Sequence, residues 1–399
     1  MFKIEGCWYE LEQSFFVARC FYNFSQKLLF VGMKNLLYQI AITQLPMVGS
    51  INAKKLIAYC GSCEEVIKSK YYQLIKIPGI GDQIAKSITL SAKAALERAE
   101  RELRFIEQEK IQPLFYLDAN YPKRLRHCED APILLYHKGN TQFENQRCIA
   151  IVGTRKATEY GKSLTEKLVS ELVPYQPLIV SGLAYGIDIC AHRAAVKNKL
   201  QTVAVFAHGL DMVYPASHRN TAINMLQQGG LLTDYPSGTN PDRENFPSRN
   251  RIVAGLVDAV VVIEAGAKGG ALITADIANS YQRDVLAFPG RVEDTASIGC
   301  NQLIKKNKAA LIESVNDLAY VCGWELQVKK KETQNKLFVE LNEQEQSVVD
   351  ALKAHPELLI DDLSFTAKLS MGKLASVLLS LELKNVVQSL PGKVYTLAH

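Results

Sequence analysis

The sequence lacks the features that mark a membrane or secreted protein. No run of 18 or more apolar residues occurs in the 399 residues, so we expect no transmembrane span and no membrane partner. A signal peptide is not expected either, because Glu5, Glu10 and Glu12 stand where its basic region would be. A hydrophobic content of 48% with 22% charged residues is typical of a globular chain. We therefore expect a cytoplasmic globular protein.

The cysteines do not form the pattern of a disulfide framework. There are nine, an odd number scattered along the chain, which favours a reducing compartment. Cys60 and Cys63 have metal-ligand spacing, but no second Cys or His pair lies at zinc-finger distance. A helix end capped by Gly61 is the simpler interpretation, and we expect no metal site.

Familiar phosphate-binding and catalytic motifs are also missing. Residues 161–163 read Gly-Lys-Ser, like the end of a P-loop, but the upstream glycine would fall at Lys156. No Gly-x-Gly-x-x-Gly follows the first predicted strand, and no Gly-x-Ser-x-Gly surrounds Ser181. Asp188 and His192 share one helix face and could pair, but without a further ligand a structural role is favoured. We predict no catalytic residue and no cofactor.

The length predicts several domains, because 399 residues exceed one ordinary core. We divide the chain into an N-terminal extension (1–32), a helical domain (33–104), an α/β domain (105–325), a linker (326–340) and a C-terminal domain (341–399). The extension lacks clear periodicity, and we hypothesise that it lies outside the functional unit, as a misplaced start codon would produce. The net charge of +5 permits a nucleic-acid partner without requiring one.

The all-α helical domain contains the same sequence motif twice. Pro46 to Gly49 and Pro78 to Gly81 each form a Pro-x-x-Gly turn followed by an apolar helix, and we expect Ser50 and Asp82 to cap these helices. The pattern resembles a tandem helix-hairpin-helix, whose backbone N–H groups can face a DNA phosphate. The first copy departs from that pattern at Met47, where glycine is usual. DNA contact and a pure packing role both remain open.

Apolar strands alternate with helices between residues 148 and 323, which predicts an α/β domain with a parallel sheet. The candidate strands are 149–152, 177–180, 202–206, 230–233, 259–263 and 285–288. A loop-rich segment precedes them, ends in a short strand near Tyr136 and is expected to serve packing. Ligands of such sheets bind beyond the carboxyl ends of the strands, so the site should lie at the junctions that follow them.

Small and basic residues follow these strands. The candidate site residues are Gly153, Arg155, Ser181, Gly182, Arg243, Phe246, Arg249, Asn250, Arg251, Lys268, Gly269 and Gly270. Arginine forks suit phosphate oxygens, a phenylalanine ring offers a stacking face, and glycine lets a ligand approach the backbone. No acid occurs in the segment 246–256. Arg249, Asn250 and Arg251 either contact the ligand or anchor the loop through carboxylates such as Glu264.

The C-terminal domain has the order of a winged helix. Helical periodicity at 343–352, 360–369 and 371–383 precedes a hairpin at 386–397, around Pro391 and Gly392. The expected recognition helix carries few charges beyond Lys373 and Lys384. Duplex DNA reading is therefore not favoured over a protein-interaction or regulatory role.

The ordered motifs of the central domain resemble the DNA-processing protein A family, DprA, also called Smf. The matching segments are 152–155, 160–161, 181–192, 211–215, 246–256, 264–275 and 288–290. The resemblance implies an extended Rossmann-like fold that binds single-stranded DNA without catalysis. It further implies a role in natural transformation, delivery of RecA recombinase and a homodimer formed through this domain.

Carried over by position, the resemblance makes Gly153 and Arg155 contacts to one phosphate. Arg243 becomes the neighbouring cation and Phe246 the stacking ring. The sequence has Thr154 where the family commonly has serine, and the threonine hydroxyl preserves the donor. Lys268 beside the Gly-Gly turn is a further phosphate candidate.

The main alternative is a nucleotide-processing enzyme of the lysine-decarboxylase-like Rossmann group. That group carries a glutamate shortly after a Gly-Gly-x-Gly-Thr turn. Residues 269–276 here contain neither the third glycine nor the glutamate, which favours the binding protein. A transcription regulator that uses only the winged helix is a weaker third interpretation.

Overall fold

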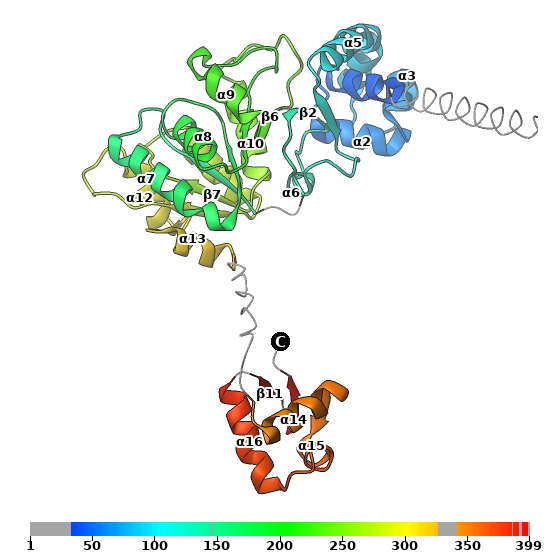
Figure 1. The fold of residues 1–399 in the computed structure, drawn as a ribbon. Coiled ribbons are helices and arrows are strands. Elements are labelled where there is room, and N and C mark those ends of the chain that lie inside the picture. The colour runs from blue at the N-terminus through cyan, green and yellow to red at the C-terminus, as the bar shows by residue number, and fades with distance from the viewer. Residues whose placement is uncertain (1–32, 145–146, 326–340, 385, 391–392, 398–399) are drawn as a thin grey trace, which may run out of the picture. The chain divides into compact units, whose positions relative to one another are not determined.

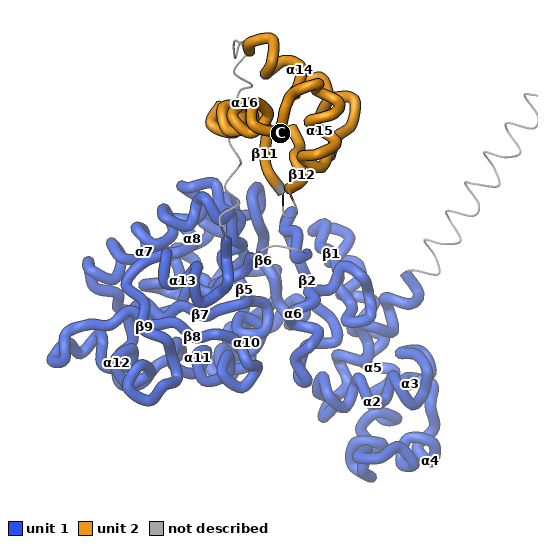
Figure 2. Tube along the Cα trace, turned by 90° about the horizontal axis from the view of Figure 1, so that it is seen from below, with its two compact units in different colours: residues 1–326 blue, residues 327–399 orange. Residues whose placement is uncertain are grey.

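The computed structural model describes residues 33–144, 147–325, 341–384, 386–390 and 393–397. They form two compact units, Met1–Leu326 and Gln327–His399, each described by itself (Figures 1 and 2). The predicted extension 1–32 and linker 326–340 lie outside the described residues. Across those that are described, no helix is long and apolar enough to cross a membrane.

A helical module opens the first unit. Its helices are 33–43, α2 (Ser50–Cys60), α3 (Cys63–Lys68), α4 (Tyr71–Leu74) and the long α5 (Asp82–Gln108). The capping prediction was wrong by one position. Gly49 and Gly81 are the N-caps, in extended conformation, so Ser50 and Asp82 are already helical and neither α2 nor α5 has a side-chain cap. Gly61 ends α2 with φ 90°, a left-handed conformation that favours glycine.

The module packs on one edge of a nine-stranded sheet of order β1-β2-β6-β5-β4-β3-β7-β8-β9 (Figure 1). The strands are β1 (Gln112–Phe115), β2 (Leu134–Gly139), β3 (Cys148–Val152), β4 (Leu178–Ser181), β5 (Thr202–Val205), β6 (Gly229–Thr233), β7 (Ala259–Val262), β8 (Asp284–Ala287) and β9 (Ala310–Leu311). All six predicted parallel strands are present, each within one residue of its expected start. The sheet is nevertheless mixed, because β1 and β2 pair antiparallel at the edge, where only one strand was expected.

Alternation along β2 joins the module to the sheet. Leu134 and Tyr136 pack among the buried residues of the helical module, whereas Leu135 between them packs in the core of the α/β domain. A strand places successive side chains on opposite faces, so one strand serves two cores. The module and the sheet are therefore parts of one packed body.

Helices cover both faces of the sheet. One face packs on α10 (Asn245–Gly255), α11 (Gly270–Ser280) and α12 (Ile298–Lys305), and the other on α7 (Glu159–Glu171), α8 (Ile187–Lys197) and α13 (Val315–Val321). Short helices α6 (Lys123–Arg126) and α9 (Arg219–Met225) complete the unit. In β3, Ile149 and Ile151 face the α7 side while Ala150 and Val152 face the α10 side. Strands buried on both faces explain the continuous apolar runs in the sequence.

The chain reverses direction across the sheet at β3. From β3 it steps outward through β4, β5 and β6, then returns to form β7 on the other side of β3. In open α/β sheets such a reversal opens a crevice at the carboxyl ends of the two strands. The junctions after β3 and β7 are thus the place where the topology itself provides a binding crevice.

The second unit has the predicted winged-helix order. It contains α14 (Glu343–Ala354), α15 (Ile360–Thr366) and α16 (Met371–Leu383), with a sheet of order β10-β12-β11 made of β10 (Glu357–Leu359), β11 (Val387–Leu390) and β12 (Val394–Leu397). Strand β10 was not predicted. Glu345, only 2% exposed, accepts hydrogen bonds from Lys384 Nζ at 2.8 Å and from Ser380, which ties α14 to α16. Lys384 is thus engaged within the unit.

Candidate nucleic-acid interface

A groove of about 710 Å³ lies where the topology predicts it, after β3 and β7. Ten of the twelve candidate residues line it, namely Gly153, Arg155, Gly182, Arg243, Phe246, Arg249, Asn250, Lys268, Gly269 and Gly270. They come from four separate junctions of the chain. The groove therefore gathers residues that are more than a hundred positions apart in the sequence.

The junction after β3 is closely packed. A Cβ on Gly153 would lie 2.4 Å from Cγ1 of Ile187, so only glycine fits against α8. The next residue, Thr154, donates its backbone N–H to the Glu264 carbonyl at 2.8 Å. The Glu264 carboxylate, 1% exposed, accepts hydrogen bonds from the backbone and hydroxyl of Thr158 at the start of α7. Glu264 therefore orders this junction and is not the anchor of Arg249.

A buried guanidinium forms the floor. Arg249 is 4% exposed and donates from Nη1 to the Val205 carbonyl at 2.7 Å, while its Nε has no partner among the described residues. A Cβ on Gly182 would come within 1.9 Å of Nη1, so the guanidinium lies directly on that glycine. Burial lowers the pKa of Arg249, but an arginine remains charged in proteins. A fixed positive charge therefore underlies the groove.

The carboxylate beside this floor is held by backbone groups. Asp188 accepts hydrogen bonds from the N–H groups of Gly182 at 3.1 Å and Ala184 at 3.4 Å. Burial raises the pKa of Asp188, and the charge of Arg249 opposes that rise. His192 does not pair with Asp188; its Nδ1 contacts Thr202 Oγ1 at 2.7 Å, and burial lowers its pKa to about 3. The acid orders the loop after β4, and the histidine is neutral.

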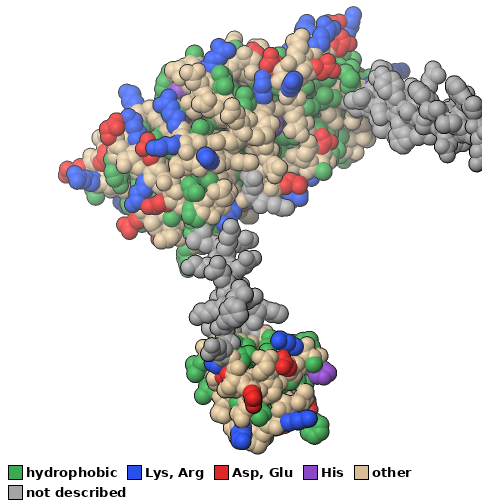
Figure 3. All heavy atoms as spheres, viewed as in Figure 1, with side chains coloured by type: hydrophobic (Ala, Val, Ile, Leu, Met, Phe, Trp, Pro, Cys, Tyr) green, Lys and Arg blue, Asp and Glu red, His purple; other side chains and the backbone are tan. Residues whose placement is uncertain are grey.

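The rim combines cations with aromatic rings. The guanidinium of Arg155 lies 5.3 Å from the ring centroid of Phe246. The ring centroids of Phe246 and Tyr214 are 6.2 Å apart. Arg243 and Lys268 are exposed. With Arg249, four cations line the groove against the single carboxylate of Asp188. On the face seen in Figure 3, basic and acidic side chains are interspersed. Among the described lining residues of the groove, cations outnumber carboxylates, which makes the groove locally positive.

The N-terminus of α11 opens into the groove. Gly269, its N-cap, makes no side-chain cap, and a Cβ there would meet no atom within 4 Å. At Gly270 the nearest atom would be Asn250 Nδ2 at 3.9 Å. The protein's own packing therefore does not require these glycines. Their effect is to expose first-turn N–H groups, which attract anions.

Two candidate residues lie outside the groove. Ser181 is fully buried in β4 and donates its hydroxyl to the Ile151 carbonyl at 2.7 Å. Arg251 forms an ion pair with Asp234 at 2.6 Å and donates to the Asp130 carbonyl. Two positions along an α-helix rotate a side chain by about 200°, so Arg249 and Arg251 face opposite sides of α10. Arg251 is an anchor, and its carboxylate partner is Asp234 instead of Glu264.

Further residues line the groove without having been candidates. Tyr214, Ile273 and Thr274 are the chief examples, and Tyr214 is 47% exposed. An exposed aromatic ring after β5 was a signal available in the sequence. The positions of Ile273 and Thr274 depend on the orientation of α11, which the sequence does not specify.

The two hairpins of the helical module differ in charge. Asp82 begins α5, where it accepts from Tyr71 and pairs with Lys86, so an acid already occupies that helix start. The start of α2 has no acid in its first turn. The start of α2 borders a second cavity of about 580 Å³, which is also lined by Asp130, Asp234 and Arg251. An acid at a helix N-terminus disfavours phosphate binding there. In this respect the start of α5, in the second hairpin, differs from the start of α2, in the first.

The fold and the groove define an α/β protein of Rossmann-like topology with a cation-lined groove at the switch point of its sheet. Comparison with known families gives the particular group. The chain belongs to the DNA recombination-mediator protein A family, whose model matches residues 112–322. A helix-hairpin-helix motif matches residues 40–92, and the DprA winged helix domain matches residues 337–393.

The chain is also similar to individual relatives and solved structures. Protein Smf from Synechocystis is 35% identical over 293 residues, which cover 72% of each chain. The crystal structure of DNA processing protein A from Streptococcus pneumoniae is 32% identical with a TM-score of 0.54, and covers 68% of this chain and 98% of that chain. DNA processing protein A from Helicobacter pylori, described for its single-stranded DNA binding mode, is 30% identical with a TM-score of 0.48, over 53% of this chain and 95% of that one.

Proposed function

We propose that this protein binds single-stranded DNA in the groove and holds it without cutting it. The observation that carries the proposal is the combination of four cations, an open helix N-terminus and two rim aromatics around one crevice. Cations and N–H groups bind a phosphate backbone, and aromatic faces stack bases of any sequence. A duplex keeps its bases paired inside, whereas a single strand presents both features together.

Non-catalytic binding is supported by the side chains of the groove. Its described lining contains no histidine and no cysteine, and Oδ2 of its one carboxylate, Asp188, accepts two backbone N–H groups. Strand cleavage requires a general base, an activated nucleophile or a carboxylate-held metal. We infer that the groove protects the strand and presents it to a second protein.

We infer that this second protein is RecA recombinase, loaded onto incoming DNA during natural transformation. Membership in a family of recombination mediators supports the inference. A homodimer formed through the Rossmann-like domain and a cytoplasmic location belong to the same proposal. Two groove sites in one dimer would raise the effective concentration of a long strand.

A gel shift that compares single-stranded DNA, duplex DNA and free nucleotides tests the central claim. We expect retention of the single strand at concentrations where neither duplex nor mononucleotide binds. Preferential duplex binding would instead favour the winged helix as the DNA reader. Tight binding of the mononucleotide alone would favour a nucleotide-processing enzyme and refute the proposal.

A further inference from the structure

The groove wall that carries Arg243 and Phe246 continues from a turn held by the helical module. The turn, residues 236–239, follows β6 and precedes α10. We propose that Glu102 of α5 is a positioning residue for the groove, because it fixes Ser237 in this turn and so fixes the wall. The inference rests on the proposed function, since it concerns the affinity of that same groove for a single strand.

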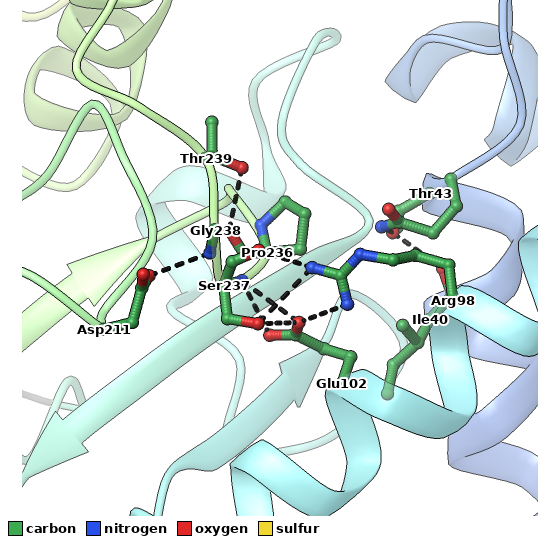
Figure 4. A network of polar contacts seen from close by, with 10 residues as sticks. Ile40, Thr43, Arg98, Glu102, Asp211, Pro236, Ser237, Gly238 and Thr239 are labelled. Carbon is green, nitrogen blue, oxygen red and sulfur yellow. Dashed lines mark hydrogen bonds and ion pairs between the residues drawn. The ribbon is translucent and has the colours of Figure 1, made fainter.

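Glu102 is 1% exposed and directs its carboxylate at Ser237 (Figure 4). The backbone N–H of Ser237 donates to both carboxylate oxygens at 3.0 Å, and its hydroxyl donates to Oε2 at 2.6 Å. Arg98, one helical turn earlier, places Nη1 2.9 Å from Oε2. A buried carboxylate is stable only when its oxygens are satisfied, and here all the partners come from two residues.

Arg98 completes the hold on the same residue. Its Nη2 donates to the Ser237 carbonyl and lies 3.3 Å from the Ser237 hydroxyl. The N–H, C=O and O–H groups of Ser237 are thus all bound by α5, across more than a hundred residues of sequence. A loop residue whose polar groups are all engaged has little freedom to move.

The opposite side of the turn is held by the loop after β5. Asp211 Oδ1 accepts the Gly238 N–H at 3.0 Å, and the Gly209 N–H donates to the Thr239 carbonyl at 3.2 Å. A Cβ on Gly209 would lie 2.6 Å from the Pro236 carbonyl, so the two loops approach as closely as glycine permits. Gly238 has φ 75°, a left-handed conformation that favours glycine. The turn is therefore clamped between α5 and the β5 loop.

Only three residues separate Thr239 from Arg243, and one of them, Pro241, itself lines the groove. Removing the Glu102 carboxylate leaves the Ser237 N–H without its acceptor and Nη1 of Arg98 without its ion-pair partner, while Nη2 of Arg98 still donates to the Ser237 carbonyl. The turn then samples other conformations, and the wall is in its binding position for only part of the time. Apparent affinity falls in proportion to the fraction of molecules in the competent state.

Glu102→Ala in the full chain tests the inference by fluorescence anisotropy with labelled single-stranded DNA. We expect affinity about tenfold weaker, which corresponds to a competent fraction of about one tenth. Glu100→Ala is the matched control, because Glu100 is exposed on the same helix, and it should bind as the parent protein does. Equal affinities of Glu102→Ala and the parent would overturn the inference.

A double-mutant cycle separates positioning from general damage. In a chain that already lacks the Arg243 and Phe246 side chains, Glu102→Ala should cost less than about threefold, because the contacts that it positions are gone. A loss of the same size in both backgrounds would show that Glu102 does not act through this wall. The cycle thus measures a coupling that a merely destabilised protein does not show.

Amide hydrogen exchange gives a readout without DNA. Residues 236–246 should exchange faster in Glu102→Ala than in Glu100→Ala, and unchanged exchange would refute the positioning role. If Glu102→Ala fails to fold, Ser237→Ala removes only the hydroxyl and must shift exchange in the same direction. Should the parent protein bind no single-stranded DNA, the proposed function fails while the exchange experiment still decides whether α5 holds the turn.

Discussion

Replacement of Arg155 by alanine gives the sharpest test of the groove. Among the described residues the Arg155 side chain makes no hydrogen bond or ion pair, and its guanidinium makes a cation–π contact with the Phe246 ring. Such a contact at an exposed site is worth about 0.5–1 kcal/mol, so the variant should fold normally. Loss of one charge-assisted hydrogen bond to a phosphate costs about 1.5 kcal/mol, or roughly tenfold in affinity.

The salt dependence identifies the lost contact as a phosphate. Each phosphate contact on a single strand contributes about 0.7 to the slope of log K against log salt. The slope of Arg155→Ala should therefore be shallower by about 0.7, and its defect should be about 2.6 times larger at 50 mM than at 200 mM salt. The assay is a salt titration of anisotropy with one labelled oligonucleotide.

Two controls accompany the titration. Lys156→Ala removes the adjacent exposed cation, which does not line the groove, and should leave the slope unchanged. Arg155→Lys keeps the charge and should restore most of the slope. An unchanged slope for Arg155→Ala, or equal effects of Arg155→Ala and Lys156→Ala, would remove Arg155 from the site.

Three further predictions follow from the structure. Phe246→Ala should weaken binding by about 1–3 kcal/mol for every sequence if a base stacks on the ring, whereas unaltered binding assigns the ring to packing. Gly182→Ala should lower the free energy of unfolding in urea by about 1–3 kcal/mol, because its Cβ displaces the buried Arg249, while Gly269→Ala, whose Cβ meets no atom, should leave stability unchanged and affect only binding. Hydrogen bonds from Lys384, Asn342 and Ser380 lower the pKa of Glu345 to about 2 from 4.5. Exchange protection of α14 and α16 should therefore be complete above about pH 4.5 and fall as the pH drops toward 2, and Glu345→Gln should abolish this dependence.

Much of this architecture could be predicted because the signals are local. The central strands are buried on both faces and appear in the sequence as short apolar runs, and the carboxyl-end rule converts them into a list of site junctions. Gly153, Gly182 and Gly269 were predicted in this way, and all three line the groove. The reason for each glycine was not predictable. A Cβ at Gly153 or Gly182 would clash with neighbouring atoms of the protein, whereas a Cβ at Gly269 would meet no atom within 4 Å.

The contacts that were missed depend on orientation or on distant partners. Arg249 and Arg251 look equivalent in the sequence, yet the helical rotation of α10 sends one to the groove floor and the other to Asp234. Ser181 ends a buried strand, and its neighbour Gly182 begins the loop that reaches the groove. The hydrogen bonds between Glu102 and Ser237 join residues 135 positions apart, and no periodicity or spacing in the sequence predicts them.

The length of α5 has a mechanical consequence. One uninterrupted helix begins at the second hairpin and carries Glu102 twenty residues later, a distance of about 30 Å at 1.5 Å per residue. The second hairpin and the carboxylate that holds Ser237 therefore belong to one helix, and any reorientation of α5 would move both together.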